Sequence, residues 1–135
     1  MNSELRLLHI GEEGGQRVKL GPYDIETLIA EADEGAATAY RIRIAPHQRT
    51  QVSYHLVAEE FYYVISGSGV AVLNGIERPV RAGDFLRLPP GTTHGFVTAA
   101  EELAMLDIHA PGSRTDRDVY FLEGGPEGFG ASPLR

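Results

Sequence analysis

The residues best suited to chemistry lie in the stretch VSYHLVAEEFYYVISG, which runs from Val52 to Gly67. It contains His55 and Glu60, and a second histidine, His94, follows in PPGTTHGF. Two imidazoles and one carboxylate can hold a divalent metal ion and leave other coordination positions open. These three side chains therefore predict a metal site, provided that the fold brings them together.

Strand periodicity gives these side chains a common direction. Residues two apart on a strand share a face, so Glu60 lies on the same face as Tyr62, and His94 on the same face as Phe96. The aromatic partners mark that face as the inner one. Charged and polar groups that point into an apolar interior are costly unless they are paired or bound to a metal. Glu59, the neighbouring carboxylate, is expected to point outward.

Two spaced motifs in this region resemble those of the cupin superfamily. The second half of the first motif, G-x5-H-x-H-x(3,4)-E-x6-G, is matched by His55, Glu60 and Gly67. The second motif, G-x5-P-x-G-x2-H-x3-N, is matched at Gly83, Pro89, Gly91 and His94. The resemblance implies an all-β fold, a cupin-like double-stranded β-helix or jelly-roll barrel with mostly antiparallel strands.

The departures from the motifs concern the site itself. Ser53 stands where the first histidine of H-x-H belongs, His47 replaces the leading glycine, and Thr98 replaces the closing asparagine. Carried over residue by residue, the resemblance implies metal ligands at His55, Glu60 and His94. The ion would be Fe, Mn, Ni or Zn. Ser53 either opens one coordination position or indicates that the metal has been lost.

Several further side chains are candidates for the pocket. The residues predicted to line it are Gln51, Ser53, Tyr62 and Phe96. Tyr62 is also a candidate proton donor, although a tyrosine pKa of about 10 suits that role only if it is perturbed, and the alternative is plain barrel core. Asp107 and His109 share a face of the last strand, and the sequence leaves open whether that face is inward. His9 and His47 are expected at the surface.

The elements that must position these residues are short strands between Gly and Pro turns. Asn74-Gly75 between apolar runs predicts a hairpin, and Ala82-Gly83-Asp84 predicts another turn. Residues 25–32 fit a short helix by spacing, but a strand over about 26–32 followed by a turn at 33–35 suits the series of hairpins better. Residues 115–123 could form a capped helical turn, with Thr115 and Asp118 as the capping box.

One domain accounts for the 135 residues. A core barrel over about 24–111 is expected, with an N-terminal arm at 1–22 and a Gly/Pro-rich, loosely packed tail at 112–135. Edge strands of a small barrel need cover, so we expect a homodimer, with the stretch ELRLLHI crossing to the partner. The resemblance to small cupins implies the same association.

Composition excludes several classes of protein. The net charge of -7 and the pI of about 5.1 argue against nucleic-acid binding. No apolar run approaches the roughly 20 residues of a membrane span, and no secretory signal is evident, so a cytoplasmic location is expected. The absence of cysteine excludes thiolate chemistry and thiolate metal ligands.

Three functions remain open. The first is a metal-dependent enzyme acting on a small organic molecule, since the resemblance implies dioxygenases, isomerases, decarboxylases and lyases. The second is a module that binds or senses a sugar or small acid at a degenerate metal site. The third is a structural or regulatory dimer with a vestigial pocket. The fold alone does not choose among them.

Overall fold

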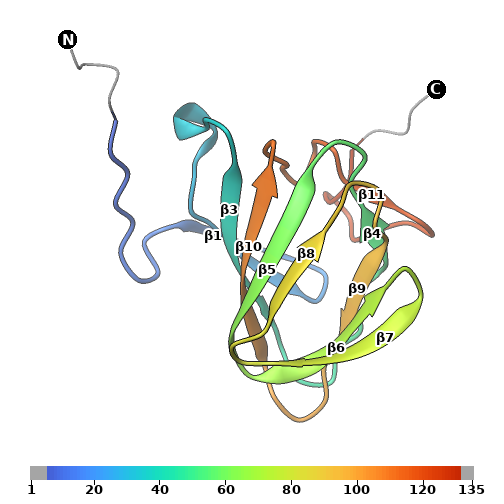
Figure 1. Ribbon diagram of the computed structural model, residues 1–135. Helices are drawn as coiled ribbons and strands as arrows, with labels where there is room; N and C mark the ends of the chain where they lie inside the picture. The colour runs from blue at the N-terminus through green and yellow to red at the C-terminus, as the bar shows by residue number, and fades with distance from the viewer. Residues whose placement is uncertain (1–5, 132–135) are drawn as a thin grey trace.

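The computed structural model describes residues 6–131 and consists of two antiparallel sheets that face each other (Figure 1). The strand order is β1-β2-β3-β10-β5-β8 in the larger sheet and β11-β4-β9-β6-β7 in the smaller one. The all-β jelly-roll prediction is confirmed. Residues 6–131 contain no helix with the length and apolar character needed to cross a bilayer. The strands are β1 (Gln16–Leu20), β2 (Tyr23–Thr27), β3 (Thr38–Ile44), β4 (Ser53–Tyr54), β5 (Glu59–Ser66), β6 (Ser68–Leu73), β7 (Ile76–Arg81), β8 (Phe85–Leu88), β9 (His94–Val97), β10 (Leu103–Ala110) and β11 (Tyr120–Phe121).

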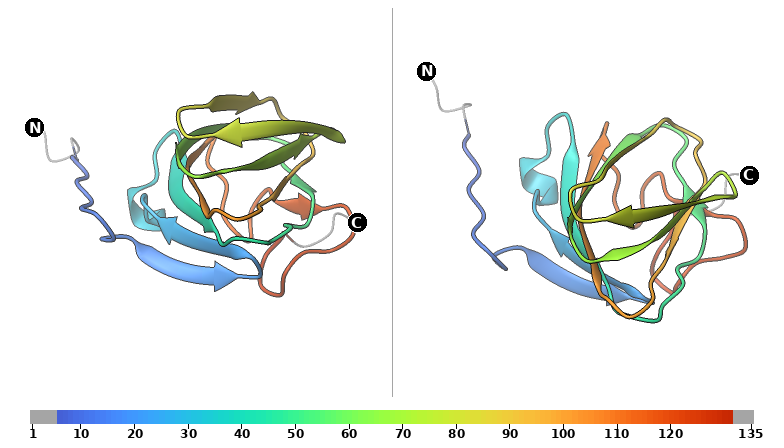
Figure 2. Two further views of the ribbon diagram at one scale, coloured as in Figure 1. Left: turned by 90° about the horizontal axis from the view of Figure 1, so that it is seen from below. Right: turned by 60° about the horizontal axis from the view of Figure 1, so that its bottom comes forward.

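The core lies between the two sheets, which curve into a barrel (Figure 2). Strand β3 shows how the sequence builds it, because Tyr40, Ile42 and Ile44 are buried while Arg41 and Arg43 are only partly buried. Strands β5 and β10 follow the same alternation. The inner faces of these two strands therefore carry both the apolar core and the polar side chains of the site.

Two turns require glycine. In the β6–β7 hairpin Asn74 and Gly75 have φ values of 50° and 79°, as a two-residue turn demands, and this hairpin was predicted. Gly67 ends β5 at a φ of 80°, and a Cβ there would lie 1.7 Å from the carbonyl oxygen of Glu102. The glycine of the first motif thus serves the backbone and not the chemistry.

The ambiguous segment at 25–32 is a strand only as far as Thr27, so the strand expected over about 26–32 is mostly wrong. Strand β2 covers Tyr23–Thr27, and a 3-10 turn follows at Glu31–Asp33. The strand prevails over the helical spacing because Tyr23 and Ile25 face the core while the backbone pairs with β1 and β3. Strand β1 (Gln16–Leu20) thereby joins the larger sheet, so this part of the expected arm at 1–22 belongs to the fold.

The expected loose tail is packed over residues 112–131. Val119 is buried, and the Phe129 ring lies 5.6 Å from that of Tyr23 and 5.2 Å from that of Phe121. Strand β11 pairs with β4 in the smaller sheet. The segment is packed and not loose because the aromatic residues among its glycines cover the end of the barrel.

The expected helical turn at 115–123 is wrong. Asp118 has a φ of 58° and uses its carboxylate elsewhere, as acceptor for the N–H groups of Leu56, Val57 and Ala58. Three backbone N–H groups thus donate to this carboxylate, whereas a capping box would supply only the N–H of Thr115. The loop at 113–118 is therefore tied to the loop that follows β4.

Candidate functional site

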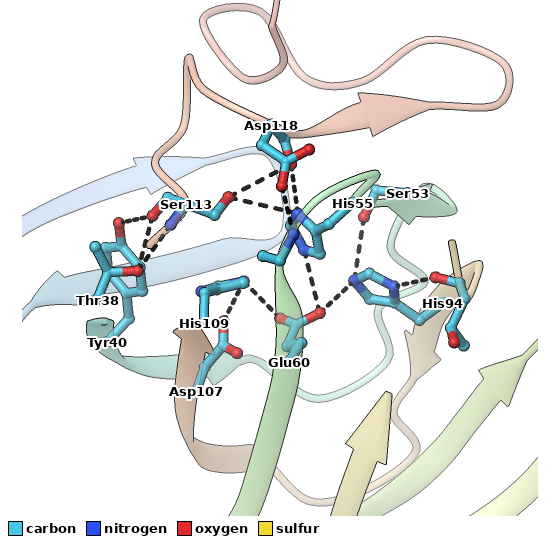
Figure 3. Close-up of polar contacts among 12 residues, drawn as sticks. Thr38, Tyr40, Ser53, His55, Glu60, His94, Asp107, His109, Ser113 and Asp118 are labelled. Carbon is cyan, nitrogen blue, oxygen red and sulfur yellow. Dashed lines mark hydrogen bonds and ion pairs between the residues drawn. The ribbon is translucent and has the colours of Figure 1, made fainter. Parts of the chain in front are cut away.

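Three imidazoles surround one buried carboxylate inside the barrel (Figure 3). Glu60 on β5 is 1% exposed. The Nε2 atoms of His55 and His94 each lie 3.1 Å from its Oε1, and Nε2 of His109 lies 2.9 Å from its Oε2. The histidines come from three places: the loop after β4, the start of β9, and β10.

Strand register creates this arrangement. Glu60 is the Cα partner of His109 in the β5–β10 pair, and Ser53 is the partner of His94 in the β4–β9 pair. The two pairs lie in opposite sheets, and the sheets close around the carboxylate. Ser53 is buried with its Oγ 3.4 Å from Nε2 of His94. The face of β10 that the sequence left open is therefore inward.

Backbone carbonyls fix the protonation of two rings. Nδ1 of His55 lies 2.6 Å from the carbonyl oxygen of Asp118, and Nδ1 of His94 lies 3.1 Å from that of Thr92. A carbonyl oxygen only accepts, so each Nδ1 carries a proton and donates it. In the neutral form of each ring, Nε2 then carries the lone pair and is the nitrogen that can bind a metal. Among residues 6–131, Oε1 of Glu60 makes no hydrogen bond despite these two close nitrogens.

The ionisation of the cluster follows from burial and mutual charge. Burial raises the pKa of Glu60, but His94 and His109 lower it more, so the pKa lies well below its ordinary value and the group is a carboxylate. Burial lowers the pKa of His55, yet its contact with Glu60 outweighs this and the net shift is upward. For His94 burial prevails and the pKa falls.

Two acidic groups with raised pKa values stand beside the carboxylate. Burial, and then the charge of Glu60, raise the pKa of Asp107 well above its ordinary value. Burial, with Asp107 and Glu60 adding to it, also raises the pKa of Tyr62 well above 10. Both shifts favour the protonated form of these groups. Asp107 lies 3.8 Å from Nε2 of His109.

The donor set fits a divalent metal ion. The ligand atoms of His55, Glu60 and His109 all lie within 4.8 Å of one another. Metal bonds of about 2.0–2.2 Å at right angles would place neighbouring ligand atoms about 3 Å apart, and the three contacts with Glu60 measure 2.9–3.1 Å. When His55 and His94 are neutral, a cation between them and Glu60 would also remove the repulsion between their Nε2 lone pairs and the carboxylate. Imidazole and carboxylate donors suit Fe, Mn, Ni and Zn.

The predicted ligands are thus brought together, with one addition. His55, Glu60 and His94 meet as expected, while His109 forms part of the tightest group and His94 lies just outside it. His109, on the sheet opposite Ser53, adds a third imidazole to the cluster. The sequence marked His109 only by its two-residue spacing from Asp107, and this spacing could not show which face of β10 points inward.

A cavity of about 50 Å³ adjoins the cluster and is lined by Ser53 and Tyr62 as predicted. At about 10–15 Å³ per water it holds roughly three to five waters, the space of a small organic molecule. Arg114, from the loop after β10, also lines it, and no local pattern marked that residue. The apolar wall consists of Tyr23, Ile25, Tyr40, Ile42, Val119 and Phe129.

Two predicted pocket residues do not line this cavity. Gln51 is exposed, because regular alternation begins only at β4 and Thr50 is the side chain that turns inward before it. Phe96 is 1% exposed and packs on Tyr62 with ring centres 5.1 Å apart, so it belongs to the core behind the site. His9 and His47 are exposed, as expected.

Comparison with known proteins gives the same assignment as the motifs. The family model described as "Cupin domain" matches residues 40–109, which is more than half of the chain. The chain belongs to the cupin family. Both motifs, the Glu60 cluster and most of the barrel lie within the matched region.

Individual cupins resemble this one moderately. The polyketide synthase CurC of Streptomyces cyaneus is 31% identical over 88 residues, which cover 64% of this chain and 57% of that protein. The chain spans less than two thirds of the length of the curated relatives it matches. Among solved structures, the nucleoside dehydratase Pac13 aligns with a TM-score of 0.73 at 22% identity, covering 87% of this chain and 92% of Pac13. The polyketide cyclase RemF of Streptomyces resistomycificus aligns with a TM-score of 0.72 at 21% identity, covering 87% and 86%. At these identities the two structures support the fold alone.

Proposed function

We propose that this cupin is an enzyme that holds a divalent metal ion among His55, Glu60, His94 and His109 and acts on a small organic molecule in the adjoining cavity. One observation carries the proposal. Three imidazole Nε2 atoms lie within 3.1 Å of a single buried carboxylate, and in two of the rings Nδ1 donates to a backbone carbonyl, which leaves Nε2 as the nitrogen that can bind a metal. A cation at the centre would satisfy all of these donors at once.

The reaction class we favour is proton transfer without redox change: isomerisation, elimination or cyclisation. When bound, a divalent ion supplies Lewis-acid polarisation of a substrate oxygen. Tyr62 and Asp107 line the cavity, burial raises the pKa of both, and in their protonated forms they can donate a proton to a substrate oxygen. The similarity to the polyketide synthase CurC supports action on a small organic molecule.

The test of the metal site is elemental analysis. The protein is stripped with a chelator, incubated with Fe, Mn, Ni or Zn, and freed of unbound ion before analysis. We expect about one ion per chain in the wild type, far less in Glu60→Gln, and wild-type content in Glu59→Gln. Glu59 is a matched control because it neighbours Glu60 but pairs outside the barrel with Arg87. Absence of metal from the wild type under all four conditions would refute the proposal.

The reaction class has a test of its own. The metal-loaded protein is incubated in D₂O with small hydroxy-carbonyl compounds and followed by proton NMR. An isomerisation or elimination exchanges a carbon-bound hydrogen for deuterium or removes it, and Tyr62→Phe should slow that exchange. Consumption of dioxygen in place of such exchange would favour an oxygenase.

A second function, binding or sensing a small molecule without catalysis, is supported by Ser53, which stands where cupins of the full motif have a ligand. It predicts a metal-free wild type that nevertheless binds small molecules in the cavity. The cytoplasmic location stays a prediction from composition.

A further inference from the structure

Arg114 borders the same cavity as the histidine cluster and is held rigidly there. Its side chain is 12% exposed. The guanidinium donates from Nε to Oε1 of Glu34 at 3.0 Å and from Nη2 to the carbonyl oxygen of Ile29 at 3.0 Å. Within residues 6–131, these bonds leave Nη1 of Arg114 without a hydrogen-bond acceptor.

The ion-pair group of Arg114, Arg117 and Glu34 holds more cations than anions. Arg117 donates from Nη2 to both carboxylate oxygens of Glu34 at 2.6 Å, so two guanidinium groups share one carboxylate. These three side chains carry +2 and -1, a net charge of +1. The excess stands out in a chain whose net charge is -7. A partly buried cation with spare donors is a favourable partner for an anion.

Arg114 is also close to the metal ligands along the chain. The preceding residue, Ser113, is 1% exposed and has its Oγ 3.4 Å from Nδ1 of His55. The Tyr40 hydroxyl donates to the carbonyl oxygen of Ser113 at 2.5 Å, and the Tyr40 ring lies 5.8 Å from that of His109. Arg114 and the histidine cluster thus line one and the same cavity.

We propose that Arg114 binds an acidic group of the substrate, so that the substrate class is a small organic acid with an apolar body. The carboxylate pairs with the guanidinium, and the apolar part packs on the wall formed by residues such as Ile42 and Val119. The reacting end then lies against the cluster at Glu60. This inference rests on the proposed function of the same cavity and adds the chemical class of the substrate.

The test compares carboxylates with their neutral amides: propionate with propionamide and benzoate with benzamide. Binding is measured by calorimetry on the full chain, both metal-loaded and chelator-treated. We expect each acid to bind the wild type at least about tenfold more tightly than its amide, and Arg114→Gln to weaken acid binding about tenfold to hundredfold. Arg117→Gln is the matched control, because Arg117 bonds the same Glu34 but does not line the cavity. We expect Arg117→Gln to change the affinity for the acids by less than about threefold, because removing an exposed ion pair has only a small effect.

The outcomes separate this inference from the proposed enzyme. Loss of the acid preference in Arg114→Gln, in a protein that binds no metal, would keep the inference and refute the enzyme. Metal binding with equal affinity for acids and amides, or an acid preference that Arg114→Gln retains, would refute the inference and leave the enzyme standing. If Arg114→Gln does not fold, the wild type decides: the Nε–H resonance of Arg114 must shift with propionate and not with propionamide.

Discussion

At Glu60 two opposing effects act on one carboxylate. Burial disfavours its charge, while His94 and His109 favour it, and the second effect prevails. A lone charge inside a barrel would be very costly, so the histidines are a condition for Glu60 to be there at all. Asp107, the next acid along the wall, has a longer contact, 3.8 Å from Nε2 of His109, and burial with the charge of Glu60 raises its pKa. The environment thus favours the charged form of Glu60 and the protonated form of Asp107.

Replacing His109 tests the ligand that the motifs do not contain. His109→Ala should weaken metal affinity by more than the roughly 10–100-fold lost with an outer partner of a metal ligand, because His109 belongs to the tightest group around Glu60. His94→Ala should also weaken it, but less. Competition with a chromophoric chelator gives the affinities, and His9→Ala is the control because His9 is exposed. Unchanged affinity in His109→Ala would remove it from the metal site.

Ser53 offers the converse experiment. It pairs with His94 across β4 and β9 and points at that ring, so Ser53→His should add an imidazole to the cluster. We expect metal affinity to rise by about tenfold or more, as an extra ligand stabilises the ion. Ser53→Ala, which removes the hydroxyl and adds no ligand, serves as the control. Equal affinity in both variants would show that position 53 cannot reach the ion.

Among the elements, the β1–β2 hairpin depends on one buried acid on the outer side of the sheet. Glu26 on β2 is 2% exposed, accepts from Nε of Arg41 at 2.8 Å, and accepts from the N–H of Gly15 at 2.9 Å. The hydrogen bond from Arg41 is the main cause that lowers the pKa of Glu26 from 4.5 to about 2. The edge hairpin is therefore attached to β3 through a charge.

The attachment predicts a pH dependence of stability. Because the pKa of Glu26 is lower in the folded chain than in the unfolded one, its contribution is complete above pH 4.5 and declines as the pH falls toward 2. The free energy of unfolding in urea should be higher for the wild type than for Glu26→Gln at pH 7, and this gap should shrink between pH 4.5 and pH 2. Glu13→Gln should show a small, nearly constant gap, since Glu13 is 60% exposed. A constant gap for Glu26→Gln would contradict the pKa.

Seen as a whole, the molecule leaves apolar surface uncovered. On the outer face of the larger sheet Tyr63 and Ile65 are each 47% exposed and Phe85 is 62% exposed, and the rings of Phe61 and Phe85 stack 6.1 Å apart. The N-terminal segment after residue 5 runs away from the barrel (Figure 1), with Leu7 fully exposed. Residues 4 and 5 of ELRLLHI lie outside the described residues. Such surface is typical of an interface between protein chains.

The expected homodimer is tested by light scattering. At micromolar concentration the wild type should have twice the chain mass of 14.7 kDa. Tyr63→Glu should give a monomer with an unchanged circular dichroism spectrum, because it places a charge in the centre of the apolar face. Ile76→Glu is the control, as Ile76 is 58% exposed on the β6–β7 hairpin away from that face. A monomeric wild type would refute the prediction.

The sequence by itself determined the features that depend on local spacing. Turn residues and period-2 alternation specified the barrel, and the motif spacing around His55, Glu60 and His94 specified three members of the cluster. Such features are readable because strand faces and turn conformations depend on residues next to each other. The tail was misjudged for the opposite reason, since the packing of Phe129 on Tyr23 joins residues far apart in the chain.

Only the tertiary structure decided which distant groups complete the site. His109 faces inward because β10 pairs in register with β5, which sets His109 beside Glu60. Asp118 fixes the ring of His55 although the two residues are 63 positions apart in sequence. Arg114 is held at the cavity by Glu34 and by the carbonyl oxygen of Ile29, both distant in sequence. Register and loop packing depend on the whole folded chain, so no local pattern could reveal these three residues.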